Sequence, residues 1–298
     1  MSQASARKAA AAKLSVVSNT LLIVLKLIVG LITGSVSILA DAVHSMTDLF
    51  AAIIAFFAVR ISEEPPDETH PYGHGKVEGI SSIIEALLIF GAVAIVLVEA
   101  VKRLIHMRPL EQLGYGLLLM LISMGVNIVV SSRLFRVAKE TESVALQADA
   151  MHLHTDVYAN IAVMVGLGLA QITGNPIFDP IVAIAVSIAV LLMPLGLMRT
   201  AWDMLIDTRL PEHELGRLER VLNSHPGVLG FHKLRSRRAG SHRIVDLHIQ
   251  VADDLSLSEA HRLTEEIEAQ LRKELPNTDV LVHAEPHEEE MRHQAEAH

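Results

Sequence analysis

Cysteine is absent from the 298 residues, which excludes disulfide bonds, thiolate metal sites and thiol nucleophiles. Aromatic residues make up only 4% of the chain, tryptophan occurs once, and no basic patch interleaved with aromatic residues is present. With a net charge of −9, this composition argues against a nucleic-acid partner. The zinc-hydrolase motif HExxH does not occur, because HELGR at 213 and HEEEM at 287 both lack the second histidine. An intramembrane metallohydrolase is therefore disfavoured, and we expect that the protein is not an enzyme.

Hydrophobic residues are in excess and account for 51% of the chain. A membrane-spanning helix needs about 20 predominantly apolar residues, and a helix satisfies its own backbone hydrogen bonds in lipid. The first apolar run is longer than a signal-peptide core, so we expect it to be retained as a span. The sequence predicts six transmembrane helices, at 14–33, 37–60, 80–101, 113–136, 147–170 and 177–206.

The composition changes near residue 207, where charged residues and histidines reach the density of a soluble protein. We therefore expect a transmembrane domain at 14–207, a small α+β domain at 208–286 and a disordered tail at 287–298. The patterns in the α+β domain predict the order helix, strand, strand, helix, strand. Ser256 and Glu259 form a capping-box pattern at the start of its second helix.

Basic residues indicate the orientation, because Lys and Arg accumulate on the cytoplasmic side of membrane spans. They occur in the N-terminal tail at 1–13, flank the second connection and follow the fourth span, whereas the first and fifth connections carry none. The third connection, with Lys102, Arg103 and Arg108, runs against this trend. The balance predicts that both termini and the α+β domain are cytoplasmic, which agrees with six spans.

Two of the apolar runs open with nearly the same motif, ADAVHSMTD and ADAMHLHTD. Residues four apart share a helix face, so His44 projects with Asp48, and His152 projects with Asp156. Two imidazoles and two carboxylates make a nitrogen and oxygen set that suits tetrahedral zinc. A bound cation also offsets the cost of a charge in lipid, about 2.5 to 3.5 kcal/mol on insertion scales. Hydrogen bonding within the bundle is the alternative for one pair, but two matched pairs favour a metal site.

Three further polar residues lie near these pairs. Asp41 and Asp149 fall one turn before the two histidines. They are either additional ligands or, as we favour, residues that support the ligands or pack the helices. His154 points elsewhere than His152, and we do not expect it to be a ligand.

The paired HxxxD motifs, six spans and histidine-bearing tail resemble the cation diffusion facilitator family, in its bacterial zinc/proton antiporter type, over nearly the whole chain. The resemblance implies a homodimer in a bacterial plasma membrane that exchanges a divalent metal, commonly Zn²⁺, for protons. It implies a ferredoxin-like, metallochaperone-like cytoplasmic domain and a transport site at His44, Asp48, His152 and Asp156. Manganese-type members tend to replace these histidines with Asp or Asn, and this chain does not. Transport of Fe²⁺, Co²⁺, Ni²⁺, Cd²⁺ or Mn²⁺ stays open, as does a metal-sensing paralogue that does not transport.

The resemblance also implies two further metal sites and a charged pair. Asp67, His70 and His74 match a DxxHxxxH loop that binds a second metal in bacterial members; considered alone, they would form a solvated loop. Family tails bind a regulatory metal pair near the dimer interface, and glutamate here replaces their usual aspartate. Surface histidines without a role are the alternative for the matching residues, which are His232, His248, His261, His283 and Glu285. Lys76 and Asp207 match a charged interlock that holds the membrane halves of the dimer together. Without the resemblance, each residue would be interpreted as an ordinary solvated charge.

Overall fold

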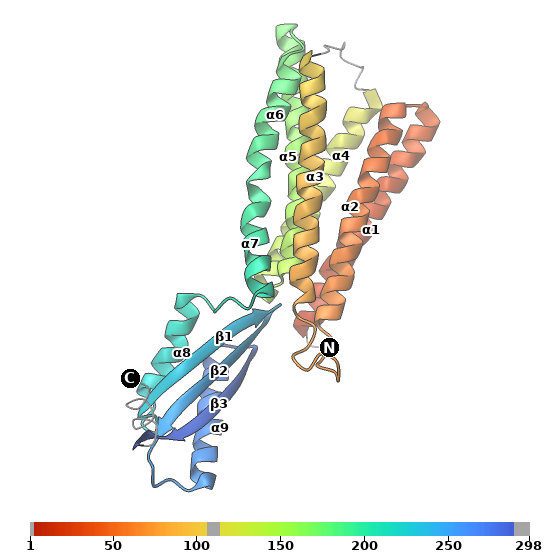
Figure 1. Cartoon of the computed structure of the whole chain (residues 1–298). Helices are drawn as coiled ribbons and strands as arrows, with labels where there is room; N and C mark the ends of the chain where they lie inside the picture. The colour runs from red at the N-terminus through yellow and green to blue at the C-terminus, as the bar shows by residue number, and fades with distance from the viewer. Residues whose placement is uncertain (1–2, 106–113, 289–298) are drawn as a thin grey trace. The chain divides into compact units, whose positions relative to one another are not determined.

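The computed structural model describes residues 3–105 and 114–288. The chain divides into two compact units, Met1–Trp202 and Asp203–His298. The first unit is built from long helices, and the second contains a three-stranded sheet with two helices (Figure 1).

Long apolar helices make up the first unit. In the described part of the chain, six helical stretches have the length and composition needed to cross a membrane, and α6 and α7 together form the last. The helices are α1 (Gln3–Thr33), α2 (Val36–Ser62), α3 (Val77–Ile105), α4 (Gly114–Thr141), α5 (Val144–Thr173), α6 (Phe178–Leu191) and α7 (Met193–Leu205). The six predicted spans are therefore confirmed.

Hydroxyl side chains start the two helices that carry the HxxxD motifs. The Ser35 hydroxyl accepts a hydrogen bond from the backbone N–H of Ile38 at the start of α2, and Ser143 does the same at the start of α5. These bonds satisfy backbone donors that have no partner inside a helix. Gly174 ends α5 with a φ of +70°, a conformation that glycine adopts without strain. Both motifs thus begin about one to two turns inside a capped helix.

Small residues let the helices approach closely. Ala51, Ala52 and Ala55 of α2 are fully buried, and α2 packs on α1, α3 and α5. A Cβ atom added at Gly166 of α5 would lie 2.9 Å from the Cα atom of Asp179 in α6. Such contacts compensate for the missing hydrophobic drive between helices in lipid.

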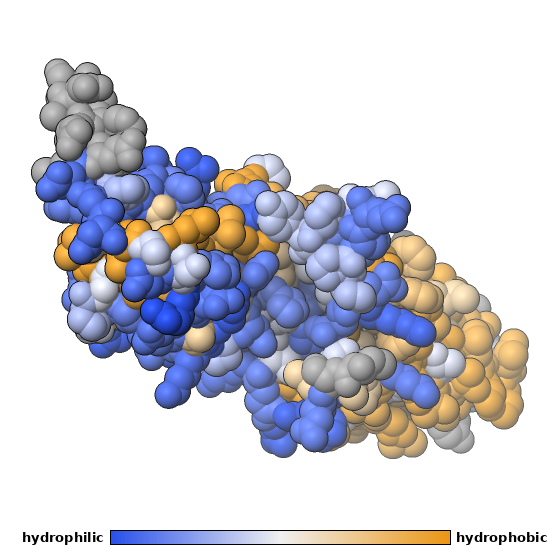
Figure 2. All heavy atoms as spheres, turned by 90° about the horizontal axis from the view of Figure 1, so that it is seen from below, coloured by the Kyte–Doolittle hydropathy of each residue, from blue (hydrophilic) through white to orange (hydrophobic). Residues whose placement is uncertain are grey.

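The outer surface of the helical unit is apolar. Ile32 and Ile172 are among its most exposed large hydrophobic side chains, at 81% and 85%. Figure 2 shows this contrast, with hydrophobic residues over the helices and mainly hydrophilic residues over the second unit. An apolar surface of this extent on long helices is what a lipid environment requires.

Two local features differ from the sequence-based expectation. The segment expected as an N-terminal tail is helical from Gln3 onward, because its run of alanines favours helix strongly. The last span is interrupted at Leu192, between α6 and α7. Pro194 explains the interruption, because proline has no N–H to donate and its ring clashes with the carbonyl four residues earlier.

The second unit is a small α+β domain. In chain order its elements are α8 (Glu212–Ser224), β1 (Gly230–Ala239), β2 (His242–Val251), α9 (Leu257–Glu274) and β3 (Thr278–Pro286). β2 lies in the centre of the sheet, antiparallel to β1 and parallel to β3. The connection from β2 to β3 runs through α9, as a parallel pair requires.

A single apolar core holds this domain together. Leu218 and Leu222 of α8 and Ile267 and Leu271 of α9 pack against inward-facing side chains of β2 such as Ile249. Ser256 and the residue three positions later form the predicted capping box at the start of α9. The predicted fold class, six membrane helices followed by a small α+β domain, is confirmed.

The predicted disordered tail is only partly covered. His287 Nδ1 lies 2.9 Å from Gln250 Oε1, and the backbone N–H of Glu288 donates to Asp253. These first two residues of the segment are therefore attached to the α+β domain. Residues 289–298 lie outside the described part of the chain.

Candidate metal centres

The two HxxxD motifs face each other between α2 and α5. Ligand atoms of His44, Asp48 and Asp156 all lie within 4.8 Å of one another. His152 joins them, because its Nε2 atom is 3.2 Å from Asp48 Oδ1. The helical spacing predicted two separate pairs, and the structure brings these four residues together.

Burial leaves polar atoms of this group without protein partners. Asp48 and His152 are buried, and the buried atoms His152 Nδ1 and Asp156 Oδ2 have no hydrogen-bond partner. Buried polar groups are normally paired, and an unpaired carboxylate oxygen inside a helical bundle is costly. A divalent cation bound by these side chains would compensate for the missing partners and offset the two carboxylate charges, so the residues fit a metal substrate.

The flanking polar residues are held by other partners. Asp149 Oδ1 accepts a hydrogen bond from the Ser15 hydroxyl of α1 at 3.0 Å, which ties α5 to α1. His154 Nδ1 lies 2.9 Å from the Ser131 hydroxyl of α4, and its ring packs edge-on against Phe135. The structure therefore directs His154 away from the four-residue cluster and gives Asp149 a helix-packing contact.

A second cluster lies in the connection between α2 and α3. His74 Nε2 is 3.2 Å from Asp67 Oδ2 and 3.1 Å from His70 Nδ1. The Asp67 carboxylate also accepts hydrogen bonds from the backbone N–H of His70 and the hydroxyl of Thr69, which hold the pKa of Asp67 well below its usual range. The turn needs Gly73, whose φ is +79°. All three predicted loop residues are thus close enough to share one cation.

The third cluster is placed by the register of the β-sheet. His248 in the central strand pairs with His232 on β1 and with His283 on β3. Glu285 lies two residues beyond His283, so both side chains are on the same face of the sheet. The Glu285 carboxylate lies 2.5 Å from His248 Nδ1, 2.8 Å from His232 Nε2 and 3.7 Å from His283 Nε2.

Glu285 is the centre of this sheet cluster. Its burial would raise its pKa, but hydrogen bonding to His248 and the charges of His248 and His232 outweigh burial and lower the pKa. The carboxylate is therefore ionised at neutral pH and available as an oxygen ligand. A nitrogen and oxygen donor set of this kind suits Zn²⁺ and similar divalent ions.

His261 is separate from the sheet cluster within one chain. It lies on α9, is exposed, and has its Nε2 atom 3.6 Å from Glu265 one turn along the helix. His225, which directly follows α8, is buried. Its Nδ1 accepts the backbone N–H of Gly227 just after α8, and its Nε2 is 3.6 Å from Glu266.

The Asp207 carboxylate accepts hydrogen bonds from Arg237 of β1 at 3.2 and 3.3 Å. This ion pair lies within the second unit. The pairing of Asp207 with Lys76 belongs to the expected homodimer and stays a prediction.

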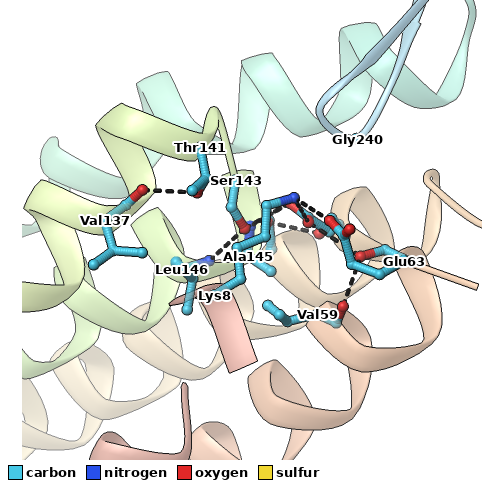
Figure 3. Close-up of polar contacts among 12 residues, drawn as sticks. Lys8, Val59, Glu63, Val137, Thr141, Ser143, Ala145, Leu146 and Gly240 are labelled. Atoms are coloured by element: carbon cyan, nitrogen blue, oxygen red, sulfur yellow. Dashed lines mark hydrogen bonds and ion pairs between the residues drawn. The ribbon is translucent and has the colours of Figure 1, made fainter. Parts of the chain in front are cut away.

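Two buried lysines escaped the sequence analysis. Lys26 lies in the C-terminal half of α1 and is only 6% exposed. Lys8, in the segment expected as a tail, is 1% exposed and contacts Glu63 and Glu78 at 2.5 and 3.4 Å (Figure 3). The signal for Lys26 was a lone charge in the apolar run LLIVLKLIVGLIT; for Lys8 no sequence signal distinguishes a buried from a solvated lysine.

Comparison with known proteins covers both units. The cation efflux transmembrane domain matches residues 12–206, and the cation efflux protein cytoplasmic domain matches residues 210–287. The cation-efflux pump FieF of Citrobacter koseri is 33% identical over 276 residues, covering 93% of this chain and 92% of the pump. FieF of Yersinia enterocolitica is 34% identical over 279 residues, covering 94% and 92%.

One solved structure matches about a quarter of the chain. The metal-bound C-terminal domain of the CzcD transporter from Thermotoga maritima is 31% identical, covers 26% of this chain and 94% of that domain, and has a TM-score of 0.24. The two family domains cover nearly the whole sequence, and the FieF pumps match it almost from end to end. This chain belongs to the cation efflux, or cation diffusion facilitator, family of integral membrane proteins and is a divalent cation efflux transporter, not an enzyme.

Proposed function

We propose that this transporter exports Zn²⁺ in exchange for protons, with the quartet His44, Asp48, His152 and Asp156 as its transport site. The observation that carries the proposal is the convergence of these four side chains between α2 and α5, with Asp48 and His152 buried. Two histidines and two carboxylates match the donor types and number that zinc prefers. Fe²⁺, Co²⁺, Cd²⁺ and Mn²⁺ are the alternative substrates, and the competition experiment in the Discussion separates them.

Proton exchange follows from the chemistry of the ligands. Neutral imidazole and ionised carboxylate bind a metal, whereas their protonated forms do not. Metal release on the more acidic side of the membrane is therefore coupled to proton uptake by the quartet. Histidine suits this role because its reference pKa is about 6.5. The intact quartet also argues for a transporter over a metal-sensing paralogue.

We further propose a regulated homodimer with both termini in the cytoplasm of a bacterial plasma membrane, which the family resemblance and the distribution of basic residues support. The sheet cluster of His232, His248, His283 and Glu285 offers a regulatory metal site, and the loop cluster of Asp67, His70 and His74 offers another. We assign His261 to the same regulatory region of the dimer, although one chain alone does not bring it to the sheet cluster. This assignment rests on the family resemblance of the tail.

The test is zinc flux into proteoliposomes that contain a metal-sensitive dye. Asp48→Ala should reduce the initial rate at least a hundredfold, because it removes a ligand that contacts His152. His154→Ala is the matched control, since it removes an imidazole from the same α5 segment outside the quartet, and it should retain most of the activity. Flux by Asp48→Ala at the wild-type rate, with equal protein incorporated, would exclude the quartet as the transport site.

A second arm of the same assay tests the exchange of protons. Uptake into vesicles with an acidic lumen should exceed uptake into vesicles at uniform pH, and a proton ionophore should remove the difference. If neither the gradient nor the ionophore changes the rate, the wild-type protein transports zinc without proton exchange.

A further inference from the structure

Lys26 is a buried cation in the C-terminal half of α1, a membrane-spanning helix. Its side chain is 8% exposed, and it lies within the apolar stretch of α1. A charged group inside an apolar span is costly and is retained where it has a partner and a function. The partners in this case come from α2, the helix that carries half of the transport quartet.

Lys26 contacts two residues of α2 that lie on either side of His44 in the sequence. The Lys26 ammonium lies 2.8 Å from Asp41 Oδ2 and donates to the Ser45 hydroxyl at 2.8 Å. Asp41 is one helical turn before His44, on the same side of the helix. The Asp41 carboxylate is therefore the carboxylate of α2 nearest to the quartet in sequence outside the quartet itself, and Lys26 is bound to it.

The charge of Lys26 also acts on the quartet itself. The ammonium interacts electrostatically with the carboxylates of Asp48 and Asp156, and Asp41 interacts with Asp156. Asp41 is about half exposed, so its carboxylate has room to change position if its partner is removed. Lys26 and Asp41 together add a nearly neutral pair beside the metal substrate, whereas either one alone adds a full charge.

We propose that Lys26 is a specificity-determining residue for metal transport, because it holds the Asp41 carboxylate out of the metal's coordination sphere and balances its charge. The quartet then binds the divalent cation with four ligands and still releases it. This inference rests on the proposed assignment of the quartet as the transport site.

The proposal predicts changes of KM in opposite directions. Lys26→Met leaves an unbalanced carboxylate beside the site, so KM for Zn²⁺ should fall on the order of tenfold and the maximal rate should fall because release slows. Asp41→Asn leaves an unbalanced ammonium, so KM should rise by a similar factor. The double variant restores neutrality, and its KM should be close to that of the wild type.

Metal preference supplies an independent readout. An added carboxylate oxygen favours harder ions, so Lys26→Met should raise the flux of Mn²⁺ relative to Zn²⁺ in competition. Asp41→Asn has no such ligand to add and should leave this ratio unchanged. A purely structural ion pair would lower the amount of active protein without changing either KM or the ratio.

The experiment measures Zn²⁺ flux in proteoliposomes of the full-length protein at equal incorporation. Lys13→Met, the same substitution at an exposed site on α1, is the matched control and should leave KM unchanged. Asp48→Ala tests the quartet separately: if it transports normally, the proposed transport site is wrong. If Asp48→Ala is inactive but the Lys26 and Asp41 variants share the wild-type KM, the role of Lys26 is wrong. If Lys26→Met does not incorporate into the vesicles, Asp41→Asn, which changes a half-exposed side chain, decides the proposal by itself: a raised KM supports it, and an unchanged KM contradicts it.

Discussion

Residues of one type take different roles on α5 according to the direction in which they point. His152 and His154 are two positions apart, yet the first contacts Asp48 of α2 and the second contacts Ser131 of α4. Successive residues of a helix are separated by about 100°, so two positions are enough to turn a side chain toward a different neighbour. The same reasoning separates Asp149, which faces α1, from the motif residues that face α2.

The histidines of the quartet should set the choice of metal. Replacing both in the double variant His44→Asp with His152→Asp creates an all-oxygen site, which suits harder ions such as Mn²⁺. We expect the flux ratio of Zn²⁺ to Mn²⁺ to fall at least tenfold when the two ions compete. His154→Asp, on the same helix, is the control and should preserve the ratio. An unchanged ratio in the double variant would show that selectivity is set outside the quartet.

Helix ends at one side of the bundle are joined by a single buried acid, Glu78 at the start of α3. Its carboxylate accepts hydrogen bonds from the hydroxyls of Ser62 at the end of α2 and Ser143 at the start of α5, at 3.1 and 2.8 Å. Lys8 of α1 supplies the compensating charge, and Figure 3 shows Lys8, Glu63 and Ser143 converging in this network. The two helices that carry the quartet are therefore connected at their ends as well as at the site.

A comparable buried carboxylate joins α8 to the sheet in the α+β domain. Glu214 forms two hydrogen bonds with Arg243 of β2, at 2.9 and 3.0 Å, and pairs with Arg238 of β1. Burial would raise the pKa of Glu214, but the hydrogen bonds and charges of the two arginines outweigh burial and lower it. A bidentate arginine and carboxylate pair is among the stronger polar contacts in proteins.

The pH dependence of this domain follows from that lowered pKa. Glu214→Gln should destabilise the domain at pH 7 by about 1.5 to 3 kcal/mol, the range for hydrogen bonds to charged groups. Because the pKa is lower in the folded state, the contribution is present above the unfolded value of about 4.3 and is lost as the pH falls through the folded value. The difference between variant and wild type should therefore shrink in acid.

Hydrogen exchange of the β2 amides in the full-length, detergent-solubilised protein measures this effect. Glu219→Gln, at an exposed position on the same helix, is the matched control and should change protection little. A difference between Glu214→Gln and wild type that stayed constant from pH 7 to below pH 4 would contradict the proposed role of the Glu214 charge.

At the scale of the whole molecule, the family assignment links a cation efflux transmembrane domain to a cytoplasmic domain, for which we propose a regulatory metal site. The transported ion and the regulatory ion then bind different parts of one chain. Coupling between the two parts requires contacts that change with metal binding. Lys76, which directly precedes α3, and Asp207, which follows α7, lie at the ends of membrane helices and are the predicted contact in the homodimer.

The coupling of Lys76 to Asp207 can be separated from the Arg237 ion pair. Asp207→Ala should reduce zinc flux although Asp207 touches no metal. Lys76→Ala should then reduce the flux of the Asp207→Ala variant by a smaller factor than it reduces the flux of the wild type. The same cycle with Arg237→Ala measures the ion pair inside the α+β domain. Cross-linking should report the dimer content of each variant. Additive losses for Asp207 and Lys76, with coupling only between Asp207 and Arg237, would rule out the interlock.

Local patterns were enough to predict most elements of this protein, apart from the helical N-terminal segment and the break between α6 and α7. Apolar runs long enough to cross a bilayer predict the six spans, because lipid forces each span to satisfy its own backbone hydrogen bonds. Spacing of four residues places His44 with Asp48 and His152 with Asp156, since a helix repeats every 3.6 residues. Alternation along β2 and the capping box at Ser256 predict the elements of the α+β domain, because both depend on neighbours in the sequence.

Long-range contacts were decided by the tertiary structure. Sequence spacing cannot state which helix lies against α2, so the pairing of Lys26 with Asp41 and the burial of Lys8 beside Glu78 follow from packing alone. The sheet register brings His232, His248, His283 and Glu285 together from three strands, while His261 stays on an exposed face of α9. The physical reason is that helix and strand periods are local, whereas the partner of a buried charge depends on which elements become neighbours when the chain packs.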